Sequence, residues 1–136
     1  MDATPMSAYL FAYGTLLPGH APVGIAVVVD RLTVVGDGFV QGRLYDLGDF
    51  PGAVLDGASA ERVFGTVYEL PNDPDILRAL DAYEEFDLSM ADKSQFVRMQ
   101  CSVTLTSGTV LDAWIYVYPR TPAPERLVPG GVFRRS

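Results

Sequence analysis

Leu10-Phe11-Ala12-Tyr13-Gly14-Thr15-Leu16-Leu17-Pro18-Gly19 is an apolar run that ends in a glycine, a hydroxyl residue and a Pro-Gly turn. Residues 8–13 lack polar alternation, which predicts a strand buried on both faces. Gly14 allows another group to approach the backbone closely, and the amide N–H groups of such a loop can hold an anion or a carbonyl oxygen. Taken alone, the stretch is better explained as an ordinary strand and turn, so its function depends on the rest of the chain.

The composition predicts one globular domain over residues 1–136, with 49% hydrophobic and 20% charged residues. The net charge of −7 argues against binding to nucleic acid or to an anionic membrane. Cys101 is the only cysteine and His20 the only histidine, so we expect no disulfide and no bound metal. Because no signal peptide or membrane span is evident, we expect a cytoplasmic protein.

Glycine-interrupted strands dominate the rest of the chain. Strands are predicted at 39–47, 53–55 and 62–70, and a hairpin at 96–105 and 109–118, whereas 23–35 is ambiguous and favours a short helix that runs into a strand. Residues 36–38, Gly-Asp-Gly, predict a turn. Gly42 and Gly65 lie inside strands, which is typical of a small, strongly curved sheet or barrel. The predicted fold class is α+β.

One helix is predicted with clear start signals. Asp73 can cap it, Pro74 suits its first position, and Asp75 suits the dipole of its first turn. The helix is expected to run to about Glu85 or Phe86. Its apolar face is made by four residues: Ile76, Leu77, Leu80 and Tyr83.

Glu84 projects into that apolar face, because it follows Leu77 by seven residues and so lies within about 20° of it. Desolvation raises the pKa of a carboxyl group toward neutrality, which suits a general acid or base. The alternative is that Glu84 reaches solvent at the helix end or pairs with Arg98. Glu85 is expected at the edge of the solvent-facing side, together with Arg78 and Asp81.

Four blocks, in order, resemble one family. They are Tyr-Gly-Thr-Leu at 13–16, Val-Gln-Gly-Arg-Leu-Tyr-Asp-Leu-Gly-Asp-Phe-Pro-Gly at 40–52, Val-Phe-Gly-Thr-Val-Tyr-Glu-Leu at 63–70, and Leu-Asp-Ala-Tyr-Glu at 80–84, followed by Phe-Val-Arg at 96–98. Together they resemble the γ-glutamylcyclotransferase-like superfamily and are similar to its small AIG2-like branch.

The resemblance implies a small mixed barrel flanked by helices, and an enzyme that releases 5-oxoproline from a small γ-glutamyl amine or γ-glutamyl peptide. It implies that Glu84 is the catalytic acid and base, and that neither a metal nor an organic cofactor is needed. The implied substrate-binding residues are Tyr13, Gly14, Thr15, Leu16, Phe96 and Arg98. Residues 85–87 depart from the family pattern, so a binding module that kept the pocket without turnover is the alternative. The sequence indicates neither the leaving amine nor the oligomeric state.

Overall fold

The computed structural model describes residues 8–14, 23–48, 51–84 and 96–132, and its ordered elements follow the expected α+β pattern. In chain order they are β1 (Ala8–Ala12), α1 (Val23–Val29), β2 (Thr33–Asp46), β3 (Pro51–Leu55), β4 (Arg62–Leu70), α2 (Pro74–Tyr83), β5 (Val97–Leu105), β6 (Val110–Val117) and the 3-10 helix η2 (Pro124–Arg126).

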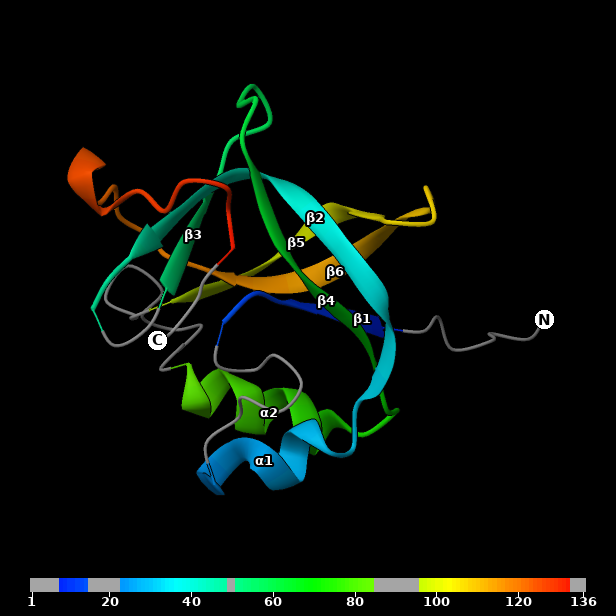
Figure 1. Ribbon diagram of the computed structural model, residues 1–136. Coiled ribbons are helices and arrows are strands. Elements are labelled where there is room, and N and C mark those ends of the chain that lie inside the picture. The colour runs from blue at the N-terminus through cyan, green and yellow to red at the C-terminus, as the bar shows by residue number, and fades with distance from the viewer. Residues whose placement is uncertain (1–7, 15–22, 49–50, 85–95, 133–136) are drawn as a thin grey trace.

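Five strands close into a barrel in the order β2-β4-β1-β6-β5, because β5 pairs back onto β2 at Gly38–Leu105 (Figure 1). β3 lies outside the ring and pairs only with the second half of β2. All pairs are antiparallel except β1 and β6, which run parallel at Leu10 and Trp114. The small mixed barrel expected from the sequence is confirmed.

Two hydrophobic cores lie on opposite faces of β1, which confirms that this strand is buried on both sides. Leu10 and Ala12 face a core shared with the two helices, whereas Phe11 and Tyr13 face the barrel interior. The alternation follows from the period of two in a strand. The barrel interior is completed by other residues that are almost wholly buried: Val40, Leu44, Ala53, Val63, Val67, Val103, Ala113, Ile115 and Val117.

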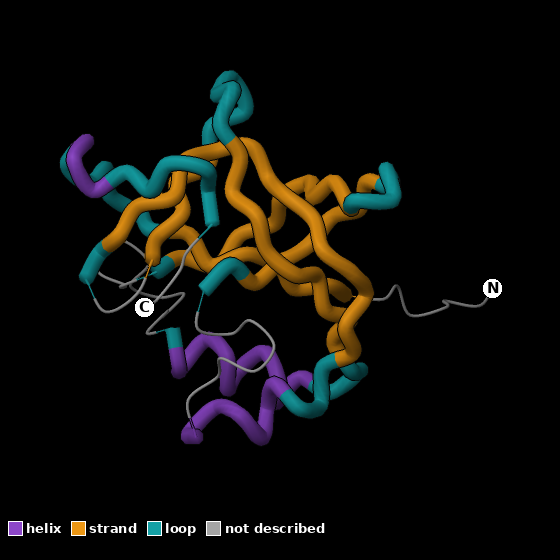
Figure 2. The backbone as a smooth tube through the Cα atoms, viewed as in Figure 1, coloured by secondary structure: helices purple, strands orange, loops and turns teal. Residues whose placement is uncertain are grey.

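The helices α1 and α2 lie side by side against one side of the barrel (Figure 2). α2 begins as predicted, because Asp73 accepts a hydrogen bond from the Asp75 N–H at 3.0 Å and Pro74 takes the first turn. Ile76 and Leu80 are buried against α1 and β1, so the predicted apolar face is confirmed. The helix ends at Tyr83, slightly before the expected end.

Close backbone approach explains the glycine in the middle of β4. A Cβ on Gly65 would lie only 2.1 Å from the carbonyl oxygen of Ala12 in β1. The prediction of a turn at 36–38 is wrong, because β2 runs through these residues with a register shift between Val34 and Gly36. Gly38 instead allows β2 to approach β5 closely where the barrel closes, because a Cβ on Gly38 would lie 2.8 Å from the Thr104 carbonyl oxygen of β5.

Candidate active site

Tyr13 follows β1 directly and ties three strands together. Its side chain is buried, and its hydroxyl donates a hydrogen bond to the Tyr116 carbonyl oxygen of β6. The same hydroxyl accepts a hydrogen bond from the Ala53 N–H of β3 at 3.1 Å. The parallel pairing of β1 and β6 brings both strand ends to the same edge of the barrel, so Tyr13 reaches the residue near the end of β6.

Gly14 lies at a bend immediately after Tyr13, and the start of β3 packs against it. A Cβ at this position would lie 2.7 Å from the Pro51 Cγ atom, so the close approach expected for Gly14 is confirmed. Thr15 and Leu16, the other half of the predicted anion-binding loop, lie outside the described residues.

Glu84 is the residue after the last helical residue of α2. Its φ and ψ of −85° and 2° depart from helical values, and its N–H donates to the Leu80 carbonyl oxygen at 2.9 Å. The residue is half-buried, as are Leu77 and Tyr83 of the apolar face. The position of the Glu84 side chain within that face stays a prediction.

The negative charge of Glu84 acts on two buried phenols. Burial raises the pKa of Tyr13 well above its usual range, the Ala53 N–H lowers it, and the charge of Glu84 raises it further. Burial, the hydrogen bond to Asp81 and the Asp81 charge raise the pKa of Tyr116, and the charge of Glu84 adds to the effect. The charge of Glu84 at the end of α2 therefore acts on both tyrosines, and both stay protonated at neutral pH.

Arg98 in β5 is held by a carboxylate that the sequence placed on the solvent side. Its Nε and Nη2 donate to the two Asp81 oxygens at 2.7 and 3.2 Å, and its guanidinium lies 4.3 Å from the centre of the Trp114 ring. Tyr116 donates its hydroxyl proton to Asp81 at 2.6 Å. The expected solvent-facing position of Asp81 is wrong, because its side chain is only 21% exposed. The sequence feature that could have indicated this contact is Asp81 itself, which lies about one helical turn before Glu84.

Phe96 precedes β5 and belongs to the core between the helices and the barrel. It is 6% exposed, and its ring meets the Tyr118 ring edge-on with centroids 6.0 Å apart. This packing in the core is a sufficient reason for an apolar ring at position 96, whether or not Phe96 contacts a ligand. Direct contact of Phe96 or Arg98 with a substrate stays a prediction.

A hollow of about 320 Å³ lies elsewhere, between β2, β4 and residues 128–131. None of the predicted site residues lines it, and its charged groups include Arg43 and Glu61, which pair with each other at 3.5 Å. Across the described ranges, no three His, Cys, Asp or Glu side chains gather in a way that could hold a metal ion. Within the same ranges, no helix is long and apolar enough to cross a membrane.

The fold defines a class of proteins: small closed barrels of five strands with two helices packed against one side (Figure 2). The chain belongs to the family described as "Gamma-glutamyl cyclotransferase, AIG2-like", which it matches over residues 10–135.

Solved structures show the same fold at low sequence identity. An AIG2-like protein from Mus musculus is 23% identical, with a TM-score of 0.71 over 94% of this chain and 88% of that chain. YkqA from Bacillus subtilis is 20% identical, with a TM-score of 0.70 over 94% of this chain, which spans only 40% of YkqA. A structure titled "Gamma-glutamyl cyclotransferase" is 16% identical, with a TM-score of 0.64 over 88% of this chain and 73% of that one. No curated protein sequence matches the chain.

Proposed function

We propose that this protein is a cyclotransferase that releases 5-oxoproline from a small γ-glutamyl amine or γ-glutamyl peptide, with Glu84 as the acid and base. The observation that supports it most is that the charge of Glu84 acts on Tyr13, the residue before Gly14, although the two residues lie far apart in the sequence. Family membership over residues 10–135 includes both parts of this site.

In the proposed reaction the substrate supplies its own nucleophile. The backbone amides of residues 13–16 hold the α-carboxylate, which places the α-amine beside Glu84. Glu84 takes a proton from the α-ammonium group, and the amine nitrogen attacks the γ-carbonyl carbon. A five-membered ring forms, so the enzyme contributes mainly orientation and proton transfer.

The second half of the reaction returns the proton. The bond between the γ-carbon and the leaving nitrogen breaks, and Glu84 donates its proton to that nitrogen. The nitrogen of the new ring loses its second proton through Glu84 to the departing amine, which leaves as an ammonium ion. The products are 5-oxoproline and the released amine, and no water is consumed. The hydroxyl of Tyr13 takes no part in proton transfer, because its hydrogen bonds already join β6 and β3 and it remains protonated.

The test is the release of 5-oxoproline from a panel of γ-glutamyl dipeptides and γ-glutamyl-ε-lysine by wild-type protein and by Glu84→Gln. General acid–base catalysis accounts for about 10²–10⁴-fold in rate, so we expect kcat to fall by about that factor. The control is Glu125→Gln in the exposed helix η2, which removes the same charge elsewhere and keeps wild-type kcat.

Two results would contradict the proposal. Full activity in Glu84→Gln would exclude Glu84 as the acid and base. Calorimetric binding of the same γ-glutamyl compounds without any product from the wild-type protein would instead identify a binding module.

A further inference from the structure

Asp81 connects the helix of Glu84 to two neighbouring strands through one carboxylate. Arg98 of β5 and Tyr116 of β6 lie directly opposite each other in the antiparallel ladder. Both side chains reach the same Asp81 oxygen, Oδ1, at 2.7 and 2.6 Å. The pair is largely shielded from solvent, with exposed fractions of 16% for Arg98 and 21% for Asp81. A shielded, forked contact of this kind fixes geometry better than a surface ion pair.

Tyr116 belongs to both halves of the site. Its hydroxyl holds Asp81, three residues before Glu84, and its carbonyl oxygen holds the hydroxyl of Tyr13, the residue before Gly14. A continuous path of three hydrogen-bonded residues therefore joins the end of α2 to the end of β1. Glu84 needs such support, because a residue at the C-terminus of a helix has the fewest helical constraints.

We propose that Asp81, Arg98 and Tyr116 form a positioning cluster that fixes the Glu84 carboxylate relative to Tyr13 and Gly14. The expected effect of this cluster on catalysis rests on the proposed function. Its expected effect on the order of the last turn of α2 rests on the geometry alone. Arg98 then acts through Asp81, because Asp81 takes two of its N–H groups while Trp114 covers a face of the guanidinium. None of the three residues needs to touch the substrate.

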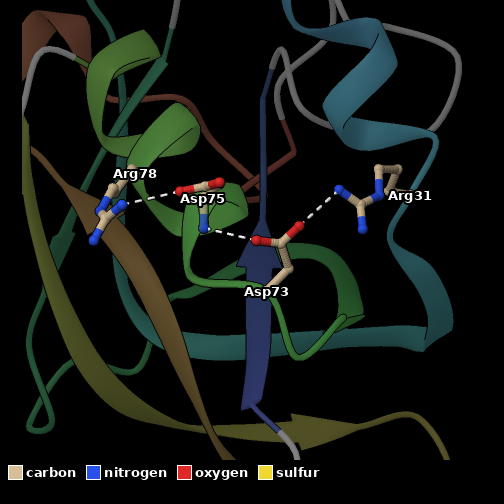
Figure 3. Close-up of polar contacts among 4 residues, drawn as sticks. All are labelled: Arg31, Asp73, Asp75 and Arg78. Carbon is tan, nitrogen blue, oxygen red and sulfur yellow. Dashed lines mark hydrogen bonds and ion pairs between the residues drawn. The ribbon is translucent and has the colours of Figure 1, made fainter.

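The opposite end of α2 offers a matched comparison. There Asp73 pairs with Arg31 at 2.9 Å and Asp75 pairs with Arg78 at 2.9 Å, as Figure 3 shows. The side chains of Asp75 and Arg78 are 78% and 77% exposed. Exposed pairs of this kind contribute little to stability or order. Asp75→Asn therefore makes the same chemical change on the same helix without touching the cluster.

The experiment compares Asp81→Asn with Asp75→Asn by amide hydrogen exchange and by steady-state kinetics. We expect the Glu84 N–H, which is bonded to Leu80, to exchange faster in Asp81→Asn while the Ile76 amide keeps its wild-type rate. We expect kcat to fall roughly tenfold to a hundredfold in that variant, with KM changed by less than about threefold, because a misplaced catalytic group lowers kcat. Asp75→Asn keeps both values.

A second variant protects the test if Asp81→Asn folds poorly. Arg98→Lys keeps the positive charge but loses the planar fork, and we expect the same loss of kcat in milder form. Equal acceleration of all amides with unchanged kcat per folded molecule would show a merely structural role and overturn the proposal. Faster exchange of the Glu84 amide together with a wild-type kcat would also overturn the proposal. If wild-type protein turns over no γ-glutamyl compound, the proposed function fails, and hydrogen exchange at Glu84 still decides whether the cluster orders the end of α2.

Discussion

Tyr13→Phe removes a single oxygen atom that two buried backbone groups share. The Ala53 N–H points away from β2 toward the Tyr13 hydroxyl, and Ala53 has no exposed surface. The Tyr116 carbonyl oxygen loses its donor in the same substitution. An unsatisfied buried donor costs about 1–3 kcal/mol, and a lost hydrogen bond to the carbonyl adds about 0.5–1.5 kcal/mol. We therefore expect the free energy of unfolding to fall by about 1.5–4.5 kcal/mol.

Urea denaturation followed by tryptophan fluorescence measures this loss, with the m-value expected to stay constant. The control is Tyr9→Phe in β1, which removes the same atom from a tyrosine whose hydroxyl makes no hydrogen bond to any described residue. We expect that control to change stability by less than about 0.5 kcal/mol. If the two variants differ by less than about 1 kcal/mol, Tyr13 does not tie the strands together as its geometry indicates.

The remaining predictions concern packing and titration. Gly65→Ala places a Cβ 2.1 Å from the Ala12 carbonyl oxygen, so we expect it to lower the unfolding free energy by at least about 1–3 kcal/mol, whereas Gly36→Ala, with open space around it, stays near wild type in the same denaturation assay. Burial raises the pKa of the Cys101 thiol to about 11, so we expect its reaction with a disulfide reagent at pH 8 to be roughly a hundredfold slower than after unfolding in urea, and equal rates would contradict this. Burial first, and then Asp81, raise the pKa of Tyr116. The folded state thus keeps that proton longer than the unfolded state, and the stability it supports is complete below about pH 10 and is lost as the pH rises further. Tyr116→Phe is expected to flatten the decline of unfolding free energy between about pH 10 and 11, and an unchanged slope would argue against it.

The sequence predicted well those elements that depend on neighbouring residues in the chain. Asp73, Pro74 and Asp75 fixed the start of α2, and the unbroken apolar run before Gly14 identified β1 as buried on both faces. The glycines inside strands correctly indicated close backbone neighbours in a curved sheet. The same residue type misled at 36–38, because a glycine that allows a turn and a glycine that admits a neighbouring strand look alike in sequence. Only the long-range pairing of Gly38 with β5 distinguishes them.

For the candidate site, the sequence suggested residues but gave little information about their contacts. The helical period predicted Glu84 on the apolar face of α2, and the residue is half-buried at the end of that helix. The helical wheel also predicted that Asp81 faces solvent, because a wheel describes a single helix without the elements that pack against it. The partners of Asp81 come from a hairpin that begins more than ten residues later, and no pattern within α2 indicates where that hairpin packs.

The parallel pairing of the first and last strands also determines when the site forms during folding. The bond from Tyr13 to Tyr116 joins residues 103 positions apart, and β6 is the last strand of the barrel. Contacts of such long range close late, because most of the chain must first be ordered between their ends. On the ribosome, neither the contact that anchors Tyr13 nor the full support for Glu84 exists until β6 has emerged. The proposed catalytic activity would thus be among the last properties that a newly made chain acquires.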